Sequence, residues 1–149
     1  ALAGEPLPGD LANYAPGHNE NNLLIVNIES VPAVENLDRI LDVPGIDSVL
    51  IGPHDLSCNL GKPEQYDDPM FLKTAETIFA KARAKGIGAG IHAWGDTASQ
   101  ARFVNMGANL LIHKADITFF KNGIRDELAE IREKLGLQPG DTATGEVNI

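Results

Sequence analysis

The chain has 149 residues, 43% of them hydrophobic, which is enough for one packed domain of ordinary composition. A formal net charge of −9 argues against nucleic-acid and membrane partners, which need clustered Lys and Arg, but leaves open a small anionic substrate held through a divalent cation. The single cysteine, the absence of a signal peptide at the first residues and the lack of an apolar run of about 20 residues predict a cytoplasmic protein.

The first half of the chain predicts a loop followed by one strand–helix unit and a second strand. Residues 1–22 are rich in Gly, Pro and Asn and indicate a loop-rich entry segment. Residues 23–28 (LLIVNI) predict a strand, and a helix then begins at Ser30 and ends at Pro44. The core face of that helix is expected to hold four apolar residues: Val34, Leu37, Ile40 and Leu41. Ser48–Ile51 is the second predicted strand.

The same alternation continues to the end of the chain. A loop at 52–67 precedes a helix that Asp68 caps, whose core stripe is Leu72, Ala75, Ile78, Phe79 and Ala82. Strands are predicted at 87–91 and 109–112, each followed by a helix with an aspartate cap: Asp96 and Asp116. The last helix has five apolar residues on one face: Phe120, Ile124, Leu128, Ile131 and Leu135. The polar tail, 137–149, is expected to be mobile.

Four strand–helix units in strict alternation predict an α/β fold with a parallel sheet covered by helices, and we assign residues 1–149 to one domain. Two architectures satisfy this pattern: an open doubly wound sheet and a (β/α)8 barrel. A barrel typically needs eight units and about 250 residues. The pattern alone therefore favours the open sheet slightly.

Residues with chemical potential follow the predicted strands, where parallel α/β folds carry their functional sites. These residues are Glu29, His54, Asp55, His92, Trp94, His113 and Lys114. The opposite edge carries Asp47 and otherwise mostly small residues. This one-sided distribution predicts a site at the carboxyl edge of the sheet.

Each of these residues also has a structural interpretation. Asp55 can cap a short turn at 56–59, and Glu29 can cap the next helix or pair with a basic residue. Three others fit ordinary rim, core or loop roles: His92, His113 and Lys114. Cys58 fits a small buried position, because nothing nearby resembles a Cys–His nucleophile arrangement.

Glu29 and Asp55 are more informative together. They follow adjacent parallel strands, so their carboxylates are expected to converge, and converging carboxylates repel unless a cation lies between them. A hard divalent cation such as Mg²⁺ or Mn²⁺ suits such oxygen ligands. The turn from Gly52 to Asp55 adds outward-pointing amides that suit a carboxylate. A 2-oxo acid would satisfy both elements.

Around these residues the sequence resembles the HpcH/HpaI family of metal-dependent class II pyruvate aldolases, which includes 2-keto-3-deoxy-sugar-acid and 4-hydroxy-2-oxo-acid aldolases. The matching segments are IVNIES at 25–30 and VLIGPHDLS at 49–57, and weaker similarity extends over residues 20–135. The two motifs place carboxylates 26 positions apart, at Glu29 and Asp55. This pair is more specific than a glycine-rich turn alone.

The resemblance implies the last four units of a (β/α)8 TIM barrel of the phosphoenolpyruvate/pyruvate type. It implies that Glu29 and Asp55 bind Mg²⁺, Mn²⁺ or Co²⁺. Gly52, Pro53, His54 and Asp55 would line the pyruvate site, with the amides of His54 and Asp55 on the substrate carboxylate. The catalytic base and the enolate-stabilising arginine are expected upstream of this chain, so none of its histidines is assigned as the base.

The implied activity is reversible aldol cleavage of a 4-hydroxy-2-oxo acid to pyruvate and an aldehyde, in a homo-oligomer. Two alternatives stay open. Related metal–enolate chemistry would give oxaloacetate decarboxylation or citryl-CoA-lyase-like cleavage. Alternatively, the chain is a non-catalytic half-barrel that acts by assembling with another chain, since the strand at 23–28 would be an unpaired edge.

Overall fold

The computed structural model describes residues 17–18 and 20–137, which fall into two units divided after His113. The first unit contains a four-stranded parallel sheet in the order β1-β2-β3-β4. Its strands are β1 (Ile25–Ile28), β2 (Ser48–Ile51), β3 (Gly88–Ala93) and β4 (Leu110–His113). The order follows the sequence, so each strand–helix unit adds one strand beside the last. This confirms the predicted α/β class with consecutive parallel units.

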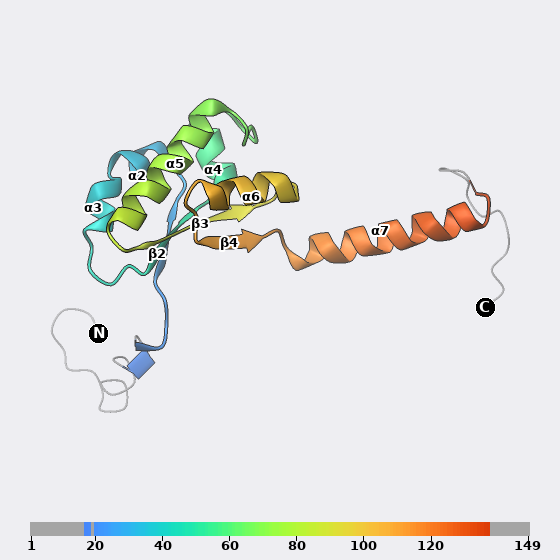
Figure 1. Ribbon diagram of the computed structural model, residues 1–149, viewed down its shortest axis with the longest axis horizontal. Helices are drawn as coiled ribbons and strands as arrows, with labels where there is room; N and C mark the ends of the chain where they lie inside the picture. Colours follow the sequence, from blue (N-terminus) through green and yellow to red (C-terminus); the bar gives the residue numbers. More distant parts are fainter. Residues whose placement is uncertain (1–16, 19, 138–149) are drawn as a thin grey trace, which may run out of the picture. The chain divides into compact units, whose positions relative to one another are not determined.

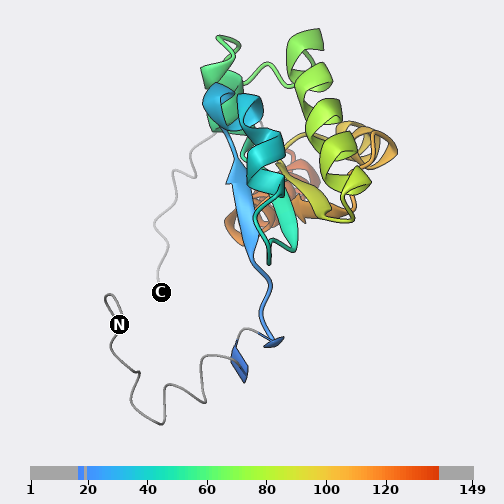
Figure 2. The same ribbon diagram turned by 90° about the vertical axis from the view of Figure 1, so that its left-hand side faces the viewer.

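Five helices of the first unit cover one face of the sheet (Figure 1). They are α2 (Val31–Glu35), α3 (Leu37–Leu41), α4 (Pro53–Asn59), α5 (Pro69–Ala84) and α6 (Thr97–Asn105). The perpendicular view shows the same arrangement, with the long helix α5 beside the strands rather than across their ends (Figure 2). The carboxyl edge of the sheet is therefore framed by the loops and helices that follow β1, β2 and β3.

Successive side chains along each strand point to opposite faces of the sheet. Val49 and Ile51 of β2 and Ile91 of β3 are almost fully buried under the helices. Ile25 of β1 and Ile112 of β4, on the other face, are 39% and 38% exposed. The core therefore lies between the sheet and the helices. Its largest fully buried side chains include Phe71 and Phe79 of α5, together with Ile28, Leu37, Leu56 and Ile78.

Three predicted helix starts are confirmed by their capping bonds. Ser30 accepts a hydrogen bond from the Ala33 amide, and Asp68 and Asp96 accept from the amides of Met70 and Ser99. The Met70 amide holds the pKa of Asp68 below its usual value, and the Ser99 amide does the same for Asp96.

The structure differs from the sequence prediction in several elements. The single helix expected before Pro44 is divided at Asn36 into α2 and α3. The loop expected at 52–67 contains α4, because Pro53 begins a helix directly after β2. Strands β3 and β4 run to Ala93 and His113, one or two residues beyond their predicted ends. The predicted cap at Asp116 is wrong, since Ala115 is the N-cap and Asp116 the first helical residue.

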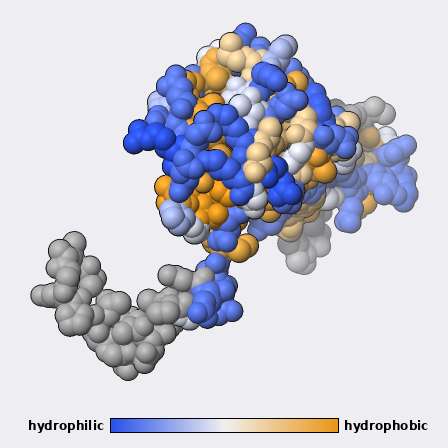
Figure 3. All heavy atoms as spheres, turned by 60° about the vertical axis from the view of Figure 1, so that its left-hand side comes forward, coloured by the Kyte–Doolittle hydropathy of each residue, from blue (hydrophilic) through white to orange (hydrophobic). Residues whose placement is uncertain are grey.

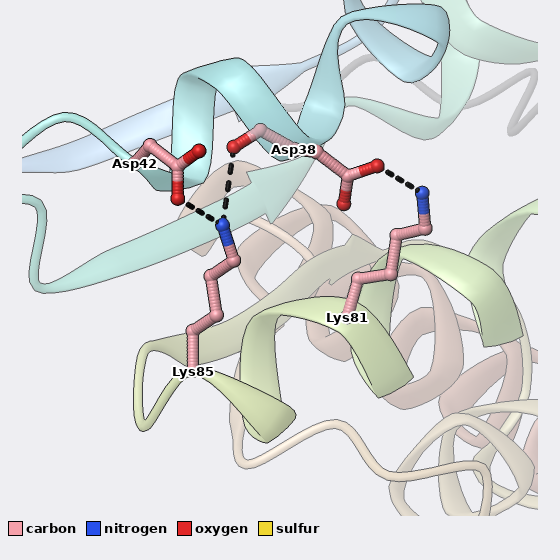
Figure 4. Close-up of polar contacts among 4 residues, drawn as sticks. All are labelled: Asp38, Asp42, Lys81 and Lys85. Carbon is pink, nitrogen blue, oxygen red and sulfur yellow. Dashed lines mark hydrogen bonds and ion pairs between the residues drawn. The ribbon is translucent and has the colours of Figure 1, made fainter.

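Ion pairs join α3 to α5 on the outer surface (Figure 4). The Lys81 ammonium lies 2.7 Å from the Asp38 carboxylate, whose pKa the Lys81 hydrogen bond lowers. Lys85 contacts the Asp42 carboxylate and donates to the Asp38 carbonyl at 3.2 Å.

Figure 3 shows predominantly hydrophilic atoms on the face it displays, with apolar atoms gathered in small areas.

The second unit contains helix α7 (Asp116–Lys134). Its predicted apolar stripe is exposed rather than buried: Phe120, Ile124, Leu128, Ile131 and Leu135. Most of the predicted entry segment, 1–22, and all but the first residue of the predicted tail, 137–149, lie outside the described residues. Assignment of the whole chain to one domain stays a prediction.

Candidate functional site at the carboxyl edge

The register of the parallel strands brings three of the singled-out positions to the same edge. Ile28 pairs with Ile51, and Ile51 pairs with Ile91. The residues that come one position later are Glu29, Gly52 and His92, so they lie side by side. Because side chains alternate along a strand, these positions belong to the face opposite the helices.

Glu29 packs directly against Gly52. A β-carbon built on Gly52 would lie 2.7 Å from Glu29 Oε2 and 3.1 Å from the Glu29 β-carbon. Asn27, two residues earlier on the same face, approaches the same carboxylate oxygen with its amide nitrogen at 3.4 Å. Glu29 is half-buried. The carboxylate is therefore held at the strand end in a space that exists because residue 52 has no side chain.

Asp55 follows Gly52 by three residues and lies in the first turn of α4. The N-cap of this helix is Gly52, which corrects the interpretation of Asp55 as the cap of a turn at 56–59. The Leu56 amide donates to the Gly52 carbonyl at 3.0 Å. The amides of His54 and Asp55 precede it and have no carbonyl to receive them within the helix. The exposed Asp55 carboxylate and two amides thus share this turn.

The His54 imidazole contacts Glu64, with Nδ1 3.4 Å from the Glu64 carboxylate. Both side chains are more than half exposed, so the pair is held loosely. Ser57, which is fully buried, donates to the His54 carbonyl at 2.8 Å and accepts from the Glu64 amide at 3.0 Å. The backbone of His54 is therefore fixed more firmly than its ring.

The remaining predicted residues do not all lie on the face of the sheet that carries Glu29. His92 stacks on Trp94 with ring centroids 4.6 Å apart, near the strand end beside Gly52. His113 pairs with Ala93 on the helix-covered face and contacts the buried Gln100 of α6, so it is not brought to Glu29. Lys114 belongs to the second unit. Cys58 is exposed, which contradicts its predicted buried position.

A cavity of about 260 Å³ lies on the helix-covered side of β3, at the loops that follow β2 and β3; Pro53 lines it, and Glu29 and Asp55 do not. Its lining includes Pro53, Tyr66, Ile91, Trp94, Asp96 and Phe103. Burial raises the pKa of Tyr66. The sequence interpretation did not single out Tyr66, because the 52–67 segment shows no period that would relate it to the strand ends.

The donor set at the edge suits a hard cation with open coordination positions. Within the part of the chain that the structure describes, no group of three His, Cys, Asp or Glu side chains is close enough to hold a metal ion. Mg²⁺ commonly takes one or two protein carboxylates and completes its octahedron with water and substrate oxygens. The carboxylates of Glu29 and Asp55 are of the type that suits this class of cation rather than a closed structural site, and their convergence on one ion stays a prediction.

Comparisons with known proteins agree with the parallel strand–helix fold. The sequence profile described as HpcH/HpaI aldolase/citrate lyase matches residues 9–121. The 2-keto-3-deoxy-L-rhamnonate aldolase of Escherichia coli K12 is 37% identical over 121 residues, which are 81% of this chain and 45% of that protein. The chain therefore spans about half the length of the curated relatives it matches.

Solved structures show the same partial coverage. An HpcH/HpaI aldolase from Desulfitobacterium hafniense superposes with a TM-score of 0.73 at 28% identity, over 95% of this chain and 55% of that one. The citrate synthase SbnG superposes with a TM-score of 0.74 at 26% identity, over 89% and 54%. The four strand–helix units thus match part of a barrel fold. No helix among the described residues is long and apolar enough to cross a membrane.

Proposed function

Because the chain belongs to the HpcH/HpaI aldolase/citrate lyase family, we propose that the protein is a carbon–carbon lyase that cleaves 4-hydroxy-2-oxo acids to pyruvate and an aldehyde. The observation that carries the proposal is the Glu29 carboxylate packed on Gly52, directly before the turn that holds Asp55. The 37% identity to a 2-keto-3-deoxy-L-rhamnonate aldolase supports the same reaction class.

In this proposal the turn after β2 binds the 2-oxo acid. The amides of His54 and Asp55 donate to the substrate carboxylate, while Gly52 and Pro53 line the pocket around it. Glu29 and Asp55 are the ligands of Mg²⁺, Mn²⁺ or Co²⁺. A divalent cation bound there supplies Lewis acidity to the 2-oxo group. Two carboxylates and water suit all three cations, so the site does not distinguish among them.

The chain's own residues bind and orient the substrate in this scheme. The amides of His54 and Asp55 bind the carboxylate end of the substrate, and the Glu29 side chain, which packs on Gly52, approaches the 2-oxo end. The imidazole of His54 faces Glu64, and His113 lies on the helix-covered face. None of His54, His92 and His113 is assigned as the base in this proposal.

The test is a coupled assay for pyruvate release from a 4-hydroxy-2-oxo acid, in the protein as it is encoded, with and without chelator. We expect turnover that requires a divalent cation and falls by at least about 100-fold in Glu29→Gln, because one of two metal ligands is lost. Glu76→Gln, an exposed glutamate on α5, is the matched control and should keep full activity. Metal-independent turnover, or full activity in Glu29→Gln, would contradict the site.

A second candidate reaction keeps the same site. The structural similarity to a citrate synthase favours oxaloacetate decarboxylation or a citryl-CoA-lyase-like cleavage as the alternative. Parallel assays with oxaloacetate, a citryl thioester and a 4-hydroxy-2-oxo acid separate these reactions by their kcat/KM values. A third candidate is a non-catalytic half-barrel that acts in an assembly with another chain, and the outer strand β1, which has one neighbour among the described strands, supports it. A cytoplasmic location and a homo-oligomer complete the proposal.

A further inference from the structure

The cavity of about 260 Å³ beside β3 has aromatic walls that neighbouring rings hold in place. Tyr66 and Phe103 line it, and both rings meet the ring of Phe71 edge-on, with centroid distances of 5.6 and 6.4 Å. Phe71 itself is fully buried in the core. Trp94 also lines the cavity and stacks on His92, with centroids 4.6 Å apart. Three aromatic side chains therefore surround this space in positions set before a ligand enters.

Two aspartates bring charge to the cavity, and one of them is already neutralised. The Asp67 carboxylate pairs with the Arg102 guanidinium, which lies outside the lining. Asp96 is the N-cap of α6, and one of its carboxylate oxygens accepts from the Ser99 amide at 2.8 Å. That bond holds the pKa of Asp96 below its usual value, so the carboxylate is ionised at neutral pH. A carboxylate has about four acceptor positions, so Asp96 can also accept from a donor in the cavity.

An ionised carboxylate beside aromatic rings suits an organic cation. The faces of the rings attract a positive charge, and the carboxylate accepts charge-assisted hydrogen bonds from an ammonium group. An anion would instead meet Asp96 as a like charge. A cavity of roughly 150 Å³ takes one benzene ring. A volume of about 260 Å³ therefore has room for a ring and a short aminoalkyl chain.

We propose that this cavity binds a primary arylalkylammonium ion, with the ammonium group on Asp96 and the ring among Tyr66, Trp94 and Phe103. The inference goes beyond the proposed function, because Glu29 and Asp55 do not line the cavity and the ligand takes no part in the aldol reaction.

The experiment uses the fluorescence of Trp94, which is the single tryptophan of the chain and lines the cavity. The probe is 2-phenylethylamine, which is protonated at pH 7; 2-phenylethanol and phenylacetate are neutral and anionic compounds of similar size. We expect a saturable change with a Kd of about 0.1–1 mM for the amine. The alcohol should bind at least about tenfold more weakly, because it lacks the charge, and phenylacetate should not bind.

Asp96→Asn separates the charge from the shape of the cavity, because the asparagine still caps α6. The Kd for the amine should rise at least about tenfold, while the Kd for the alcohol stays within about twofold of the wild type. Asp68→Asn is the matched control. It removes the same charge from the N-cap of α5, which does not line the cavity, and should leave both Kd values unchanged.

Ala93→Leu tests the cavity itself, because Ala93 is buried and lines it. The larger side chain occupies part of the space and should abolish binding of the amine and of the alcohol. Circular dichroism shows whether this variant is folded, and if it is not, Asp96→Asn decides.

Three results would overturn the inference. Equal affinity for the amine and the alcohol, or tighter binding of phenylacetate, rejects an ammonium ligand. A Kd for the amine that a folded Ala93→Leu or Asp96→Asn leaves unchanged rejects this location. The absence of any saturable change with the amine rejects the site. None of these measurements involves pyruvate release, so failure of the proposed aldol reaction leaves the inference standing.

Discussion

At the scale of single residues, the site depends on the absence of a side chain at position 52. Glu29 Oε2 lies 2.7 Å from the place where a β-carbon would stand, which is closer than non-bonded atoms tolerate. Gly52 has a φ of −83°, so an alanine would meet no backbone strain there. The glycine is required by the carboxylate that packs on it and not by its own conformation.

We therefore expect Gly52→Ala to displace the Glu29 carboxylate while leaving the fold intact. Affinity for Mn²⁺, measured by calorimetric titration, should fall about tenfold, as for other changes that move a metal ligand without removing it. Gly123→Ala is the matched control, because a β-carbon at Gly123 meets nothing within 4 Å and the residue lies in α7. An unchanged Mn²⁺ affinity in Gly52→Ala would show that Glu29 does not bind the cation.

Asp96 gives a prediction on pH. The Ser99 amide bond holds the pKa of Asp96 below its usual value, so the ionised cap stabilises the folded state above the unfolded pKa. This contribution is lost as pH falls through the lower, folded pKa. Asp96→Ala should lower the Tm by about 2–4 °C at pH 7, and the difference should shrink as pH falls through the folded pKa of Asp96.

The control for this prediction is Asp96→Asn, whose amide oxygen still caps α6 but does not titrate. Its Tm should exceed that of Asp96→Ala, and the difference between these two variants should not depend on pH. Thermal unfolding of all three proteins from pH 7 downward provides the measurement. A wild-type advantage over Asp96→Ala that stays constant to low pH would contradict the capping charge.

At the scale of the elements, the sequence predicted the features that depend on residues close to one another in the chain. The caps at Ser30, Asp68 and Asp96 and the strand Ser48–Ile51 are where the sequence places them. Helix α4 was missed because the Gly-Pro pair at its start also signals a turn. The packing of Glu29 on Gly52 could not be predicted, since it depends on the register between β1 and β2. Glu64 was missed because its contacts with Ser57 and His54 arise from loop geometry.

The contact between α3 and α5 carries the third prediction. Lys81 and Lys85 reach Asp38 and Asp42 across the outer surface, where solvent screens each pair (Figure 4). A double-mutant cycle on Asp38→Ala and Lys81→Ala should show a coupling worth less than about 2 °C in Tm. The coupling should shrink further in about 1 M salt, where the Debye length is near 3 Å. A coupling that is large and independent of salt would contradict this surface assignment.

At the scale of the whole molecule, the sheet has two strands with an unpaired side among the described residues. β1 and β4 are the outer strands, and each pairs with one neighbour. The face opposite the helices exposes Ile25 and Ile112, which in a closed barrel would meet further strands. The matched residues make up about half the length of these relatives. An exposed apolar edge of this kind favours association.

The last prediction follows from these edges. The 149-residue chain by itself should associate, with a sedimentation coefficient and a Tm that rise with protein concentration. Ile25→Lys places a charge on the outer strand β1 and should shift the equilibrium toward monomer at least about tenfold. Val43→Lys is the control, because Val43 is also exposed but lies between α3 and β2, and it should leave association unchanged. A stable, well-folded monomer at every concentration would show that the outer strands do not drive association, and it would reject the assembling half-barrel as a candidate function.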